Sequence, residues 1–125
     1  MEVHVKYMLL IHFDQEAWGK LSLTERQKVY GKHVQLGEQL RSSRQYLAGH
    51  PLQPPSTTAT VRIRDGKRLV TDGPFAETRE QLGGYMLIDA KDLDEAIGIA
   101  ARIPMARKGT IEIRPVIDIP GLPPT

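Results

Sequence analysis

The sequence predicts a single α+β domain: a β-sheet with two helices on one face and an added β-hairpin. Three observations predict this class: segments in which apolar residues alternate, two capped segments with helical spacing, and Asp65-Gly66 between two short strands. The 125 residues suit one domain, expected over residues 1–118, with a proline-rich tail over residues 119–125.

The first strand is expected from Val3 to Phe13, where every second residue is apolar. Its other face carries Met8 and Leu10, so this face is also partly apolar. A strand with two apolar faces needs a cover on each side. Helices cover one face, and a second copy of the chain is expected to cover the other, which predicts a homodimer.

Two helices follow from capping signals. Ser22-Leu23-Thr24-Glu25 fits a capping box and predicts a helix to about Ser43. Its inner stripe is expected to be Val29, His33, Leu36 and Leu40. Asp92 opens the second helix, and Pro104 ends it. The apolar face of this second helix is expected to comprise Leu93, Ala96, Ile97 and Ala100.

The remaining strands are expected at residues 46–50, 58–64, 67–71, 84–89 and 110–116. Strands 58–64 and 67–71 form the hairpin, because a two-residue Asp-Gly turn favours positive φ. The order of elements predicts a ferredoxin-like sheet elaborated by this hairpin. Two such sheets packed face to face would form a dimeric α/β-barrel-like assembly.

Charge, cysteine content and residue spacing argue against several classes of function. The net charge is only +2 and the basic residues are scattered, which argues against direct nucleic-acid binding. The absence of cysteine fits a reducing cytoplasm and removes thiolate chemistry. No signal peptide, membrane span or metal-binding spacing is found, so we expect a cytoplasmic protein with no metal and no membrane partner.

The segment from Asp72 to Glu80 is the strongest candidate for a site. Pro74 fixes its own φ and restricts Gly73, so the pair holds Asp72 in one direction at a strand end. Asp72 is either a functional carboxylate or the acceptor of an Asx turn. Phe75 is either a core residue or one wall of a pocket.

Polar ligands are expected near the same segment. Glu77 and Arg79 either bind such a ligand, with Arg79 as a fork for a carboxylate or phosphate, or form a solvated loop. Glu112 and Arg114 alternate outward on the last strand, where Arg114 is either a cleft wall or a solvated edge residue.

The run Asp72-Gly73-Pro74-Phe75-Ala76-Glu77-Thr78-Arg79-Glu80 resembles the signature DGPFAETKE of the DGPF branch of the YCII-related family. Arg79 stands where the signature has lysine. The resemblance extends from Lys6 to Val116 and includes Glu112-Ile113-Arg114-Pro115-Val116. It implies a family and a fold, and it implies no defined reaction and no cofactor.

The same resemblance draws attention to His33. In the wider family, a histidine on the first helix pairs with an aspartate that precedes a proline after the second helix. Here that position is Ile103, so the family's aspartate is missing, and Asp72 supplies the carboxylate instead only if its loop folds toward the helix. We therefore expect His33 and Asp72 to border one pocket as catalytic residues; otherwise His33 is a core residue.

Three classes of function remain open. The first is an enzyme or binding protein that takes a small polar metabolite in a cleft near the Asp72–Glu80 segment. The second is a non-catalytic accessory protein, because relatives that resemble this chain are associated with extracytoplasmic-function sigma factors. By analogy of fold alone, cofactor-free monooxygenases are a third.

Overall fold

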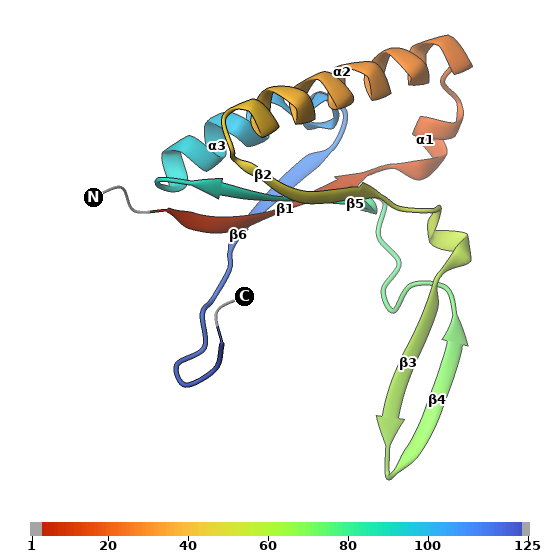
Figure 1. Ribbon diagram of the computed structural model, residues 1–125. Coiled ribbons are helices and arrows are strands. Elements are labelled where there is room, and N and C mark those ends of the chain that lie inside the picture. Colours follow the sequence, from red (N-terminus) through yellow and green to blue (C-terminus); the bar gives the residue numbers. More distant parts are fainter. Residues whose placement is uncertain (1–3, 124–125) are drawn as a thin grey trace.

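The computed structural model describes residues 4–123 and shows two layers and an arm (Figure 1). One layer is a four-stranded antiparallel sheet, and the other consists of helices α2 and α3 on one face of it. A β-hairpin and the segment 116–123 extend away from the opposite face. Val3 and the last two residues of the tail, all part of our predictions, lie outside the described residues.

The sheet has the strand order β2-β5-β1-β6. Its strands are β1 (Val5–Phe13), β2 (Tyr46–Pro51), β5 (Gln81–Ala90) and β6 (Thr110–Pro115). With α2 (Leu23–Ser42) and α3 (Leu93–Arg102), the elements follow the order β-α-β-β-α-β. The predicted α+β sheet with two helices on one face is confirmed.

The caps of both long helices are confirmed. The Ser22 hydroxyl accepts a hydrogen bond from the Glu25 amide at 3.1 Å, and Asp92 accepts one from the Glu95 amide at 2.9 Å. Such a cap typically contributes about 1 kcal/mol to helix stability. Pro104 begins the short 3-10 helix η2 (Pro104–Arg107), so it ends α3 as predicted.

The core lies between the sheet and the two helices. Its largest fully buried side chains are Leu9, Leu40, Met86, Ile88 and Ile103, each contributing about 1.5–3 kcal/mol of burial. On α2 the buried residues include Leu36 and Leu40 of the predicted stripe.

The predicted apolar face of α3 is partly wrong. Ala96, Ile99 and Ala100 are buried, whereas Leu93 and Ile97 are 49% and 48% exposed. Ile103 continues the buried face beyond α3. The helix is therefore rotated so that the line from Ala96 to Ile103 faces the sheet, because this line continues into the buried residue that follows the helix.

The hairpin β3 (Ala59–Arg64) and β4 (Lys67–Asp72) forms a sheet of its own. Asp65 and Gly66 have φ of 51° and 73°, which confirms the predicted turn. The hairpin projects from the body of the domain (Figure 1). Its apolar side chains are exposed: Val61, Ile63, Leu69 and Val70.

The sheet face opposite the helices is apolar at its centre. Met8 pairs with Leu87, and Leu10 pairs with Tyr85, across β1 and β5. These four residues point away from the core face of Leu9 and Met86, since side chains alternate along a strand. We call this patch of Met8, Leu10, Tyr85 and Leu87 the open face.

No helix in residues 4–123 has the length and apolar character that crossing a membrane requires.

Candidate functional site

Gly73 fixes the start of the Asp72–Glu80 segment. Its φ of +89° lies in the region that favours glycine, so a residue with a Cβ would be strained at this position. Its amide donates to the Thr58 carbonyl at 2.7 Å, and its carbonyl accepts from the Thr60 hydroxyl at 2.6 Å. These bonds tie the segment to β3 where the hairpin joins the domain.

The far end of the segment is tied to β6. The Thr78 hydroxyl donates to the Glu80 carbonyl at 2.6 Å, which closes a local turn. The Thr110 hydroxyl donates to the Glu80 carboxylate, also at 2.6 Å. Glu80 therefore has a specific partner on β6, and both ends of the segment have fixed positions.

A short helix that the sequence analysis missed lies beside this segment. Asp14 caps α1 (Gln15–Gly19), and its carboxylate accepts hydrogen bonds from the amides of Glu16 and Ala17 at 3.0 and 3.1 Å. Trp18 packs against Phe13 and Tyr30 with ring centroids 5.8 and 5.4 Å away, which fixes α1 to β1 and α2. An aspartate directly after a strand-like run is a helix-start signal that would have indicated α1.

A cleft of about 710 Å³ opens between α1, the 3-10 helix η1 (Pro55–Thr57) and the end of the Asp72–Glu80 segment. We call it the loop cleft. It is lined by Asp14, Gln15, Glu16, Ala17, Lys20, Pro54, Pro55, Ser56, Thr78, Arg79 and Gln81. Its volume is in the range of small-molecule sites.

Both signs of charge meet in the loop cleft. Arg79 Nε lies 3.5 Å from Asp14 Oδ2, and Lys20 Nζ lies 3.6 Å from Glu16 Oε1. The Ala17 amide is the main cause that lowers the pKa of the Asp14 carboxyl; Arg79 and the Glu16 amide act in the same direction, and partial burial opposes them. Asp14 therefore stays ionised as the anionic partner of Arg79.

Comparison with known proteins assigns this domain to a family. The YCII-related domain matches residues 5–120. The chain belongs to the YCII-related domain family. It is also 46% identical over 67 residues to an uncharacterized protein of Rhizobium meliloti (strain 1021), a match that covers 52% of this chain. The chain spans about half the length of this curated relative, since 54% of the relative is matched.

In this YCII-related domain, the structure places one of the predicted ligand-binding residues in the loop cleft. Arg79 lines it and is 91% exposed at its side chain. Glu77 is exposed and does not line the cleft, and Phe75 is 80% exposed, so it is not a core residue of this chain. Arg114 is exposed on β6, opposite Met8 of the open face.

The structure does not bring His33 and Asp72 together within one chain. His33 lies on α2, above the sheet, and Asp72 ends β4 of the hairpin that extends from the other side (Figure 1). Neither side chain has a hydrogen-bond or ionic partner among residues 4–123, so the predicted Asx turn at Asp72 is not formed either. A shared site would need a second copy, and it stays a prediction.

The partial burial of His33 is expected to make the free energy of unfolding depend on pH. Burial lowers its pKa below the ordinary value of 6.5. Around that value the unfolded chain binds more protons than the folded chain, so the free energy of unfolding falls as pH drops through 6.5. Urea unfolding at pH 7.5 and 5.5, at one protein concentration, should show this loss. The His33→Gln variant should lose less stability than wild type; an equal loss would contradict the assignment to His33.

Proposed function

We propose that this YCII-related protein binds a small polar metabolite in the loop cleft, with Arg79 as the contact for a carboxylate of the ligand. The observation that carries the proposal is that Arg79 is exposed in the cleft and leaves most of its hydrogen-bond donors unused. It lines the cleft, is 91% exposed, and reaches Asp14 only through Nε, at 3.5 Å. Its two terminal nitrogens have no partner in residues 4–123, so they present a fork that suits a carboxylate.

The other charged residues of the loop cleft limit which functional groups the ligand carries. Lys20 supplies a second cation, whereas Asp14 and Glu16 supply acceptors. A ligand with a carboxylate and a hydrogen-bond donor would satisfy both sets of groups. The same segment carries the resemblance to the DGPF signature, with arginine at position 79 in place of lysine, so the proposed contact keeps a cation at that position.

We further propose that the protein works as a homodimer whose open faces pack together in an α/β-barrel-like assembly. The support is the pairing of Met8 with Leu87 and of Leu10 with Tyr85 on a face without helices. Burying apolar surface contributes about 25 cal/mol per Å², and a standard interface buries about 800 Å² per partner.

The exposed arm gives independent support to the dimer. Val61, Ile63 and Val70 are 57–59% exposed on a hairpin that stands away from its own domain. A lone two-stranded hairpin is only marginally stable in water, so a second copy is a natural partner for it. Phe75, which is 80% exposed and follows this hairpin in the chain, would gain a cover from the same partner. Any pairing of Asp72 with His33 would also need the second copy, because the two residues lie on opposite sides of the sheet in one chain.

Native mass spectrometry after incubation with a metabolite extract tests the binding role. Wild type should retain one acid of defined mass, and Arg79→Ala should bind that acid at least about tenfold more weakly, since a hydrogen bond to a charged group is worth about 1.5–3 kcal/mol. Arg68→Ala, on the exposed hairpin, is the matched control and should bind like wild type.

Two outcomes would contradict this proposal. One is equal affinity of Arg79→Ala and wild type for the retained acid. The other is the absence of any retained small molecule together with a stable complex with an extracytoplasmic-function sigma factor, which would support the accessory role instead.

A further inference from the structure

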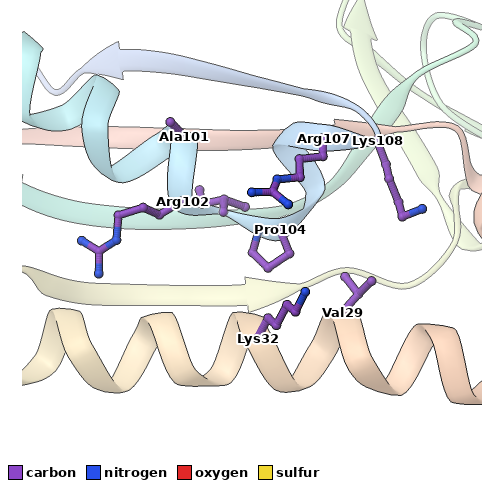
Figure 2. A pocket seen from close by; sticks show the side chains of 8 residues that line it. Val29, Lys32, Ala101, Arg102, Pro104, Arg107 and Lys108 are labelled. Atoms are coloured by element: carbon purple, nitrogen blue, oxygen red, sulfur yellow. The ribbon is translucent and has the colours of Figure 1, made fainter.

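A second hollow lies on the helical side of the domain. It has a volume of about 550 Å³ and lies between α2 and the junction of α3 and η2. We call it the cationic crevice, lined by Val29, Lys32, Ala101, Arg102, Ile103, Pro104, Arg107 and Lys108. Four of these eight side chains are cations, and none is acidic. Lys32 points from α2 toward Pro104 on the facing segment (Figure 2).

The walls of the cationic crevice are held in place. Ile103 is 1% exposed and belongs to the core, so the backbone beneath the crevice cannot shift without disturbing the packing. The Ala106 amide donates to the Ile103 carbonyl at 2.9 Å, which holds η2 against the end of α3. Arg102 donates to Gln39 on α2 at 2.6 Å and so joins the two sides.

The cations of the crevice are not neutralised by the protein. Within residues 4–123, no carboxylate lies in ion-pair contact with any of them, namely Lys32, Arg102, Arg107 and Lys108. The dipole of α3 accounts for Arg102, which lies in the last turn of that helix. Arg107 belongs to η2, a four-residue turn too short for such an effect. Lys32 lies in the middle of α2, where no dipole end requires a cation.

We propose that the cationic crevice binds a small organophosphate. Like charges held around one hollow repel each other, and a multiply charged anion would relieve that repulsion. Arg107 offers a planar fork and Lys32 a point charge, which is a combination that recognises phosphate groups. Val29 and Pro104 add apolar wall for the organic part of the ligand. The net charge of only +2 favours a local site over a surface field for nucleic acid.

The crevice and the loop cleft share no lining residue. The organophosphate site therefore stands apart from the proposed function, and each can fail alone. Arg79→Ala, which should impair the loop cleft, should leave the crevice unchanged.

Calorimetric titration with inorganic pyrophosphate tests the proposal, at a salt concentration of about 0.1 M to screen long-range attraction. Wild type should bind one pyrophosphate per chain in a saturable manner. Lys32→Ala and Arg107→Ala should each weaken binding about tenfold, the effect of losing one charged contact. Lys32→Arg should retain binding, which separates loss of the contact from loss of the fold. Arg68→Ala should stay within about twofold of wild type, since exposed charges away from a site contribute little.

Three results would overturn the proposal. The first is the absence of saturable binding to wild type. The second is an equal loss in Arg68→Ala, which would mean general attraction to a basic chain. The third is loss of pyrophosphate binding in Arg79→Ala and not in Lys32→Ala, which would place the anion in the loop cleft.

Discussion

Leu10→Arg is expected to convert the proposed dimer into a monomer of 14.0 kDa. Leu10 lies on the open face, paired with Tyr85 on β5 and with Glu112 on β6. In the proposed dimer each arginine would be buried against apolar side chains of the other copy. Glu112 could pair with this arginine across the strands, but removing the charge from water in an apolar interface still costs several kcal/mol, enough to cancel an interface of standard size. Light scattering at micromolar concentration would measure the change.

Val34→Arg is the matched control for this prediction. Val34 is 57% exposed on α2, on the other layer of the domain, so the same charge there should leave the dimer intact. If wild type itself scatters as a monomer, or if Leu10→Arg remains a dimer, packing through the open face is wrong. The hairpin would then need another partner.

Gly83→Ala is expected to lower the free energy of unfolding by about 1–3 kcal/mol, the usual cost of overpacking. Gly83 is the extra residue of a β-bulge, because Ile11 pairs with Gly84 while His12 pairs with Leu82. A Cβ at Gly83 would collide with the Phe13 ring. That ring cannot turn away freely, because Trp18 packs beside it.

Gly98→Ala provides the comparison in the same chain. Gly98 lies in α3, and a Cβ there would meet no atom within 4 Å. Alanine favours a helix over glycine by about 0.5–1 kcal/mol, so this variant should be more stable than wild type. Urea unfolding of both variants, at equal protein concentration, would show changes of opposite sign. Equal stability of Gly83→Ala and wild type would mean that Phe13 relaxes without cost.

Several turns and helix ends around the site follow from local rules and were predictable. The turn at Asp65-Gly66, the caps at Ser22 and Asp92, and the positive φ of Gly73 each depend on one or two residues and their neighbours. Within β5, Gly83 forms a bulge and packs closely against Phe13, which fits the two roles that glycine usually has in a strand.

The partners of Arg79 were not predictable in this way. Asp14 and Lys20 come to the loop cleft from the two ends of α1, about sixty residues earlier in the chain. A local signal at Asp14 can indicate the start of α1, but no local rule brings α1 beside the Asp72–Glu80 segment. The cations of the crevice likewise come from α2 and from the end of α3, which only packing brings together.

The sequence by itself determined the family, the type and order of the main elements, and the conformation of Gly73, because these depend on periodicity, capping and backbone sterics between near neighbours. Tertiary structure decided which face of α3 is buried, that His33 and Asp72 lie on opposite sides of the sheet, and that Arg79 meets Asp14. The reason is physical. Local rules act within a turn or a strand, whereas a site is assembled by core packing that fixes how distant segments rotate and approach.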